Sequence, residues 1–263
     1  NIVGFVLNDV SSKSGGYYGG RSTGSWSGGG GRAAKRYLDM GCAIWPEFNA
    51  VRKGPLPPRT LFPEAQVYIG REPDFVFAVK GGNNNEFHNH NDVGSWSLLV
   101  KGVEVAGEGG SERYGRDTFT KNRYKLPMLN SYGHPVPVIG GALQATGKRW
   151  HAKILSTAFD DGHDRIVLDL GGAYSNLVSK SDSLVRTVDF TRGDSPSVSI
   201  SDAVDFGRPM AFESVFLTCG DIERLADGKS VRITRSGVTM TGRVDVRGEG
   251  NWHFEEKTIP HNE

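Results

Sequence analysis

From Val67 onward the chain is a succession of short runs rich in Val, Ile, Phe and Thr, separated by residues that favour turns. Examples of these runs are FVFAVK, SWSLLV, RIVLDL, VRTVDF, SVSIS, SVFLT, SVRIT and RVDVR. Runs of this length and composition are typical of β-strands. About twelve such strands at roughly 10–15-residue spacing, without helices between them, predict a mainly β fold, a large antiparallel β-sandwich.

Turn chemistry supports this antiparallel arrangement. Hairpins are predicted at Lys101–Gly102, Asp161–Gly162 and Asp227–Gly228, because glycine accepts the positive φ that tight hairpin turns require.

The first 60 residues have a different composition. Residues 11–32, SSKSGGYYGGRSTGSWSGGGGR, form a low-complexity segment for which a long loop is predicted, since glycine is costly inside helices and strands. Tyr17, Tyr18 and Arg21 in this loop are candidate substrate-binding residues of a sugar-contacting flap, and a linker that carries a few aromatic residues is the equal alternative.

A helix and a connector are predicted after this loop. The run RAAKRYLDMG has apolar residues at helical spacing and a glycine placed to end the helix, and five prolines follow within nineteen residues. We therefore expect a boundary near residue 60. Residues 1–60 would form a loop, helix and connector, and residues 61–263 the sandwich domain.

Charge and cysteine content exclude several classes of protein. The net charge of +1 over 263 residues is far from the strongly basic footprint of nucleic-acid binders, so nucleic acid is not an expected partner. Residues 1–60 hold eight Lys and Arg against three Asp and Glu, which fits either a solvated surface or a rim that attracts a polyanion. No stretch approaches the roughly 18 apolar residues of a membrane span. Two cysteines, Cys42 and Cys219, exclude a disulfide framework and a cysteine-rich zinc module.

Candidate chemistry is concentrated in the segment NNNEFHNHNDVGSWSLLVKGVEVAGEGG and in NSYGHPVPVIGG. His88 and His90 are two residues apart, and an extended backbone would point both to one face. Glu108 and His134 could complete an N/N/O site with His90 of the kind that zinc accepts. Ordinary hydrogen-bonded histidines are the alternative interpretation of the same residues.

Strand geometry restricts how such a site could form. A two-residue turn at Lys101–Gly102 would place Ser95 opposite Glu108, and His90 would then lie five residues further along, roughly 16 Å away in an ideal strand. A regular hairpin therefore cannot bring His90 to Glu108. The segment HNHNDVG must bend back over the sheet, and its Asn, Asp and Gly residues permit this bend.

Several blocks of the sequence, in order, resemble the heparinase II/III-like polysaccharide lyases over roughly residues 60–205. The blocks are LFPEAQVYIGRE, FHNHNDVGSWSLLVKG, EVAGEGGSERYG, NSYGHPVPVIGG and DLGGAYSNLVSKSDSLVRTVDF. The second is similar to the family's H-x-H-x-D-x-G-S-F block. The third departs from the family's Asp-Pro-Gly step, since Glu108 stands at the acidic position and Gly109 where Pro is usual; Pro135 stands where an Asn often follows the next His.

The resemblance implies roles for individual residues. His88 matches the family's histidine that faces a uronate in the cleft, and His90, Glu108 and His134 match its zinc ligands, with the metal in a structural role. Tyr124 lies approximately where alginate-type members place a substrate-contacting tyrosine, and we count it with His88 as a candidate catalytic residue.

The resemblance also implies a reaction and a partner segment. Members cleave anionic polysaccharides by β-elimination at a uronic acid and act in the periplasm or outside the cell. An N-terminal α/α toroid carries their base and acid, well over a hundred residues before the H-x-H block. Only 87 residues precede His88. The chain therefore looks like the end of a toroid plus the C-terminal sandwich, catalytically incomplete without an upstream toroid segment.

Two alternatives from other classes stay open. The first is a non-catalytic carbohydrate-binding or structural β-sandwich, which the missing toroid favours. The second is a cupin-like metal enzyme, since cupins also combine H-x-H with a distant His. Cupins usually carry a Glu three or four residues after H-x-H, where this chain has Gly94 and Ser95.

Overall fold

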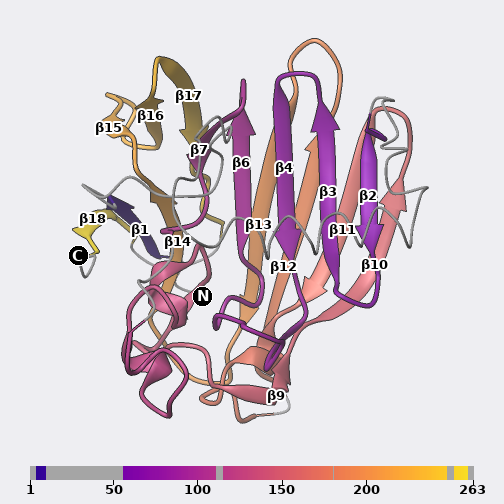
Figure 1. Cartoon of the computed structure of the whole chain (residues 1–263). Coiled ribbons are helices and arrows are strands. Elements are labelled where there is room, and N and C mark those ends of the chain that lie inside the picture. Colours follow the sequence, from indigo (N-terminus) through magenta and orange to yellow (C-terminus); the bar gives the residue numbers. More distant parts are fainter. Residues whose placement is uncertain (1–3, 10–55, 111–114, 180, 248–251, 260–263) are drawn as a thin grey trace, which may run out of the picture. The chain divides into compact units, whose positions relative to one another are not determined.

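The computed structural model describes residues 4–9, 56–110, 115–179, 181–247 and 252–259. Regular structure in these residues is almost entirely β-strand, and the two largest sheets are antiparallel (Figure 1). In spatial order, the five-stranded sheet contains β2 (Arg59–Phe62), β3 (Val67–Glu72), β4 (Phe75–Lys80), β6 (Trp96–Val100) and β7 (Val103–Ala106). The other of these two sheets has four strands, β10 (Lys153–Phe159), β11 (His163–Asp169), β12 (Ser183–Thr191) and β13 (Ser197–Asp205).

These two sheets form the layers of a sandwich, with β2, β3, β4 and β6 in front of β10–β13 (Figure 1). One cluster of buried side chains draws on both layers, including Tyr68 and Phe77 from the first and Leu168, Val188 and Phe190 from the second. Successive side chains of a strand point to opposite faces, and β12 accordingly alternates between buried and half-buried residues. The predicted mainly β sandwich is confirmed.

Three smaller sheets adjoin these layers. One contains β18 (Phe254–Thr258), β1 (Gly4–Asp9), β14 (Phe212–Thr218) and β8 (Val138–Ile139) in that order. Another contains β15 (Asp221–Arg224), β16 (Ser230–Arg235) and β17 (Val238–Arg243), and the last pairs β5 (Asn83–Asn84) with β9 (Gly147–His151). Short 3-10 helices cover Arg123–Lys125, Ser131–Gly133 and Gly171–Ala173. In the described ranges, no helix is long and apolar enough to cross a membrane.

Strand β1 departs from the expected organisation of the first 60 residues. It pairs in parallel with β14 and with β18, whereas the two large sheets are antiparallel throughout. By its contacts it belongs to the same compact unit as the chain from Pro58 onward. The first segment therefore contributes a strand as well. The helix expected at residues 32–41 lies outside the described residues, and the division at residue 60 stays a prediction.

The Lys101–Gly102 hairpin has the predicted geometry. Both residues have positive φ, 50° and 76°, and Val100 pairs with Val103. One step further a β-bulge shifts the register between Leu98 and Leu99, so the regular pairing that the sequence suggested does not continue toward Ser95.

The other two predicted hairpins form with different turns. At Asp227–Gly228 the glycine has φ of 67°, but the turn is longer than two residues, since the backbone N–H of Leu225 donates to the carbonyl of Ser230. Gly162 joins β10 and β11 without a positive φ. Instead, the carboxylate of Asp160 accepts the N–H groups of Gly162 and His163 at 2.8 and 2.7 Å, and this bonding supports a turn that needs no left-handed residue.

Candidate functional site

One cavity, of about 380 Å³, gathers the residues in which candidate chemistry was expected. Its walls come from β3, β4 and β6, from the loop between β5 and β6, and from segments that follow β7 and precede β8. The polar residues that line it are Lys80, His90, Asp92, Ser95, Ser97, Glu108 and His134. The loop therefore bends back over the sheet, as the sequence required.

His134 lies at the centre of this group. It is only 1% exposed, and its Nδ1 is hydrogen-bonded to the carboxylate of Glu108. The ring of His90 lies 5.1 Å from that of His134 between centroids. The other ring nitrogen of His134, Nε2, is buried and has no hydrogen-bond partner among the described residues. Because buried polar atoms are nearly always paired, this nitrogen is a candidate position for a bound ligand.

Burial and neighbouring charge act differently on the three titratable groups. Burial lowers the pKa of His90 to about 4, helped by the charge of His134, so His90 is neutral at pH 7 and able to act as a metal ligand. Burial would also lower the pKa of His134, but the adjacent Glu108 carboxylate outweighs it and raises that pKa. Burial would raise the pKa of Glu108, and the pairing with His134 lowers it instead.

The donor types fit zinc, whereas their present arrangement fits it only in part. Within the described ranges, no three His, Cys, Asp or Glu side chains form a ready group around one metal position. One reason is that the Glu108 carboxylate is hydrogen-bonded to Nδ1 of His134. A carboxylate behind a histidine in this way commonly orients the ring so that the other nitrogen binds a metal. The buried, unpartnered Nε2 of His134 is consistent with such a use.

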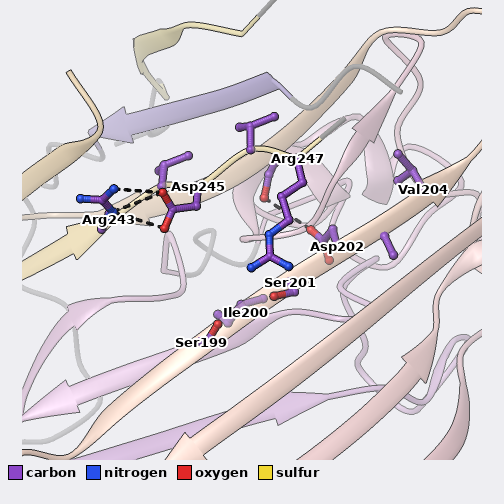
Figure 2. Close-up of a pocket in the computed structure, with 12 residues that line it drawn as sticks. Ser199, Ile200, Ser201, Asp202, Val204, Arg243, Asp245 and Arg247 are labelled. Carbon is purple, nitrogen blue, oxygen red and sulfur yellow. Dashed lines mark hydrogen bonds and ion pairs between the residues drawn. The ribbon is translucent and has the colours of Figure 1, made fainter. Parts of the chain in front are cut away.

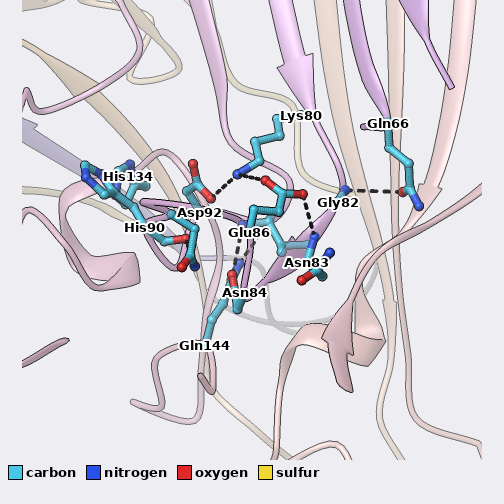
Figure 3. Close-up of polar contacts among 12 residues, drawn as sticks. Gln66, Lys80, Gly82, Asn83, Asn84, Glu86, His90, Asp92, His134 and Gln144 are labelled. Carbon is cyan, nitrogen blue, oxygen red and sulfur yellow. Dashed lines mark hydrogen bonds and ion pairs between the residues drawn. The ribbon is translucent and has the colours of Figure 1, made fainter. Parts of the chain in front are cut away.

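Lys80 is the cation of the cavity, and the sequence did not single it out. Its Nζ lies 2.6 Å from Asp92 and 3.0 Å from Glu86 (Figure 3). Burial would lower the pKa of Lys80, but these two carboxylates raise it, so the lysine stays charged. Both acidic residues of the loop are thus neutralised by a residue at the end of β4.

Buried side chains hold the backbone of this loop in place. The amide of Gln144 donates to the carbonyl of Val93 at 2.7 Å and accepts the Val93 N–H at 3.0 Å, as a neighbouring strand would. Gly94 follows with φ of 89°, and a Cβ there would lie 2.6 Å from Leu170, so only glycine fits.

Arg186 ties this loop to the second sheet. It is fully buried on β12 and forms two hydrogen bonds of 2.7 Å to the carboxylate of Asp202 on β13. Its Nη1 donates to the carbonyls of Gly94 at 2.6 Å and Pro135 at 3.1 Å. These carbonyls lie in the two segments that carry His90 and His134, so one guanidinium links both segments to the sandwich core.

His88 does not share an extended backbone with His90. Its φ is +58°, in the left-handed region, and its side chain is exposed beside the rings of Phe87 and Phe119. The premise that an extended chain points both histidines to one face is therefore wrong, because the loop turns at His88. The role of His88 stays a prediction.

The remaining candidate residues fall in two groups. The hydroxyl of Tyr124 donates to the side chain of Asn89 at 2.8 Å, which places this tyrosine beside the loop that carries both histidines. Tyr17, Tyr18 and Arg21 lie outside the described residues, and their expected contacts with substrate stay predictions.

A second cavity, of about 550 Å³, lies at the open edge of β13 (Figure 2). Asp202 forms part of its wall but is already bound by Arg186, and Arg243 is paired with Asp245 at 3.2 Å. None of the predicted site residues lines it. The first cavity is therefore the candidate site.

The described fold is similar to part of the fold of heparinase III. One solved heparinase III, with methylated lysines, matches with a TM-score of 0.54 and 17% identity over 80% of this chain and 32% of its own. A further heparinase III crystal structure matches with a TM-score of 0.52 and 18% identity, over 70% of this chain and 28% of its own. The chain thus spans about a third of the length of these structures. No protein-family model and no curated protein matches its sequence.

Sequence reasoning missed Lys80, Asp92, Gln144 and Arg186. Asp92 continues the alternation of His88 and His90, and that spacing could have identified it. Arg186 interrupts a row of inward apolar residues on β12, which is a signal for a buried charge with a partner. Gln144 carries no comparable signal, because its role depends on a contact with a residue 51 positions away.

Proposed function

We propose that this chain forms the β-sandwich part of a polysaccharide lyase that cleaves a uronic-acid-containing anionic polysaccharide by β-elimination. The observation that carries the proposal is the gathering of His90, Glu108 and His134 at one cavity, with a buried, unpartnered ring nitrogen on His134, in a fold similar to part of heparinase III. A shared fold does not establish an activity, so the proposal depends on these side chains.

The reaction requires three positioned groups. A base removes the proton at C5 of the uronate, a second group neutralises the carboxylate so that negative charge can build up, and an acid protonates the leaving oxygen as the C4–O bond breaks, which leaves an unsaturated uronate. Proton transfer to a positioned side chain contributes about 10²–10⁴-fold. In this proposal exposed His88 meets the uronate, and Tyr124 is the chain's own candidate for proton transfer.

Zinc has a structural role in this proposal. His90 and His134 would supply nitrogen ligands, and Glu108, which is hydrogen-bonded to Nδ1 of His134 in this structure, is the candidate oxygen ligand. The bound ion would supply a fixed positive centre that keeps the loop of residues 85–95 folded back over the sheet. Gln144 and Arg186 hold the backbone of the same loop through their own hydrogen bonds to Val93 and Gly94.

The rest of the proposal concerns the complete protein. An upstream α/α toroid of the same protein would supply the missing acid and base, Tyr17, Tyr18 and Arg21 would contact the substrate, and the enzyme would act in the periplasm or outside the cell. The share of the heparinase III structures that this chain covers, 32% and 28%, leaves room for such a segment.

The test is an assay for unsaturated uronate by ultraviolet absorbance, on this chain and on a version extended upstream. We expect little product from the chain alone and turnover from the extended protein. In the extended protein, His88→Ala should lower kcat strongly with zinc content and Tm nearly unchanged, whereas His90→Ala should lower all three. Turnover that is unaffected by His88→Ala would refute the role of His88.

A second candidate function is a non-catalytic carbohydrate-binding sandwich. The observation in its favour is that the chain spans about a third of the heparinase III structures it matches. Oligosaccharide binding without any product from the extended protein would support this function over the lyase.

A further inference from the structure

Two exposed phenylalanines and a histidine form a cluster of neighbouring rings beside the candidate site, here called the aromatic platform: Phe87, His88 and Phe119. Phe87 is 94% exposed and Phe119 is 63% exposed. The His88 ring lies 4.4 Å from that of Phe87 and 5.4 Å from that of Phe119, between centroids. Large apolar side chains that gather on a surface in this way mark binding sites more often than single exposed residues do.

Arg123 links the two loops that carry the aromatic platform. Its guanidinium donates to the carbonyls of Asn89 at 2.8 Å and Thr118 at 2.7 Å, and more weakly to that of His88 at 3.3 Å. It also lies 5.8 Å from the centre of the Phe119 ring. One side chain thus fixes the loop before β6 against residues 115–125.

The backbone of the aromatic platform is strained. A left-handed φ at a non-glycine residue is energetically unfavourable and persists only where the surroundings enforce it. The surroundings of His88 do so through the hydrogen bonds of Arg123. The exposed rings therefore occupy positions that the protein holds at an energetic cost.

The charges around the aromatic platform are positive. Residues 115–125 contain four basic residues and one acidic residue, Asp117. Arg116, Lys121 and Lys125 are exposed, and none of them has an ion-pair partner in the described part of the chain. On the other side, Glu86 and Asp92 are both neutralised by Lys80. Unpaired cations beside aromatic rings are complementary to an anionic ligand that also has an apolar face.

We propose that the aromatic platform binds a sugar ring of an anionic oligosaccharide, at a subsite adjoining the candidate site. Phe87 and Phe119 stack on the apolar C–H faces of the pyranose, and Arg116, Lys121 and Lys125 pair with its carboxylate or sulfate groups. This assignment rests on the proposed function for the class of saccharide, and it adds the residues that contact it.

Isothermal titration calorimetry on the 263-residue chain tests the assignment, with a heparan sulfate hexasaccharide as ligand and neutral maltohexaose as the matched sugar control. We expect the hexasaccharide to bind and maltohexaose not to bind. The double variant Phe87→Ala/Phe119→Ala should weaken binding about tenfold, because it removes two aromatic contacts at the centre of the interface. Phe62→Ala, at another exposed phenylalanine (51%), should leave the affinity unchanged.

A charge variant separates stacking from simple attraction. Lys121→Gln/Lys125→Gln should weaken hexasaccharide binding and reduce its dependence on salt. Polyphosphate, a polyanion without a pyranose ring, should respond to the lysine variant and not to the phenylalanine variant. Undetectable hexasaccharide binding, or an affinity that Phe87→Ala/Phe119→Ala leaves unchanged, would overturn the assignment.

The lyase assay distinguishes this failure from failure of the proposed function. Product from the extended protein with an unchanged KM in Phe87→Ala/Phe119→Ala would refute the aromatic platform and leave the lyase in place. Binding that the phenylalanine variant weakens, without product from the extended protein, would refute the lyase and leave the aromatic platform in place.

Discussion

Two buried ion pairs lie close to the same loop, and they differ in one respect. Every guanidinium nitrogen of Arg186 has an acceptor: Nε and Nη2 bind Asp202, and Nη1 binds the carbonyls of Gly94 and Pro135. His134 is buried to a similar degree and is paired with Glu108 through Nδ1. Its Nε2 has no partner among the described residues.

The difference indicates separate purposes for the two pairs. A buried polar group without a partner costs about 1–3 kcal/mol. The pair Arg186–Asp202 is complete and serves to hold the structure together. The pair His134–Glu108 is complete on one side only, and in the proposed function a metal ion would bind on the other side.

The largest expected effect is the loss of Arg186. Arg186→Met would leave Asp202, whose side chain is 4% exposed, as an uncompensated buried charge. Removing one partner of such a pair costs about 3–5 kcal/mol, which urea unfolding would measure. Arg165→Met is the control, because exposed Arg165 pairs with Asp189 on the same sheet, and the denaturation midpoint of this variant should hardly change.

Adding Asp202→Leu to Arg186→Met should recover part of the lost stability. Equal midpoints for the two arginine variants would contradict a structural role for Arg186.

The next largest effect concerns zinc binding. If His134 needs no ligand, the contrast between the pairs Arg186–Asp202 and His134–Glu108 does not hold. We expect about one zinc per chain by elemental analysis, and none in His90→Ala or His134→Ala. Excess zinc should stabilise the wild-type chain by about 2.7 kcal/mol at 100 times Kd, and neither variant. His163→Ala, at a partly exposed histidine paired with Asp189, should retain the metal. Full zinc content in both variants would refute the ligand set.

A pH-dependent effect is expected at Asp164, another buried carboxylate with a complete set of partners. Burial would raise its pKa, but hydrogen bonds from Arg59, Tyr68 and Arg192 lower it below 3.8. A depressed pKa gives stability that is present above the unfolded value of 3.8 and is lost as the pH falls through the folded value. Asp164→Asn should therefore cost about 2 kcal/mol near neutral pH, and the difference from wild type should shrink as the pH falls below 3.8 and through the folded pKa of Asp164.

Urea unfolding of both proteins between neutral and acidic pH measures this difference. Asp221→Asn is the control, because Asp221 is exposed and has no side-chain partner among the described residues. A difference between Asp164→Asn and wild type that stays constant down to acidic pH would contradict the ionic origin of the effect.

The smallest effect is expected on zinc affinity. It tests whether the candidate metal site depends on the hydrogen bonds that hold its loop in place. Gln144→Met removes both hydrogen bonds to Val93, and the loop that carries His90 should then be less well placed. Zinc affinity should fall about tenfold, the lower end of the range for groups that orient metal ligands. Gln66→Met is the control, since Gln66 bonds the backbone of Ala152 and Gly82 outside this loop. Equal zinc affinity in both variants would show that Gln144 does not position the site.

The strands and one hairpin could be predicted because their signals are local. Alternating apolar residues identify β12, and the Lys101–Gly102 turn has the backbone that its glycine indicated. The bulge between Leu98 and Leu99 could not be predicted, because either register satisfies the local pattern. The parallel pairing of β1 with β14 joins residues about 200 positions apart, and strand composition does not specify so distant a partner.

The candidate site, too, could be predicted from the sequence only in part. The motif brought His90, Glu108 and His134 into consideration, and the structure places all three at one cavity. Nothing local indicates that Arg186 reaches Gly94 across 92 residues. The left-handed backbone of His88 depends on hydrogen bonds from Arg123, which lies 35 residues later, so the orientation of that histidine could not be derived from its neighbours.

The reach of Arg186 also has a consequence for biosynthesis. The loop that carries His90 leaves the ribosome long before the residues that fix it, because Gly94 precedes Asp202 by 108 residues. At about 5–20 residues per second, this interval lasts roughly 5–20 s. During that time Phe77 and the strands β4 and β6 have no second sheet to cover them. The nascent chain would therefore expose apolar surface that a chaperone can bind before the sandwich closes.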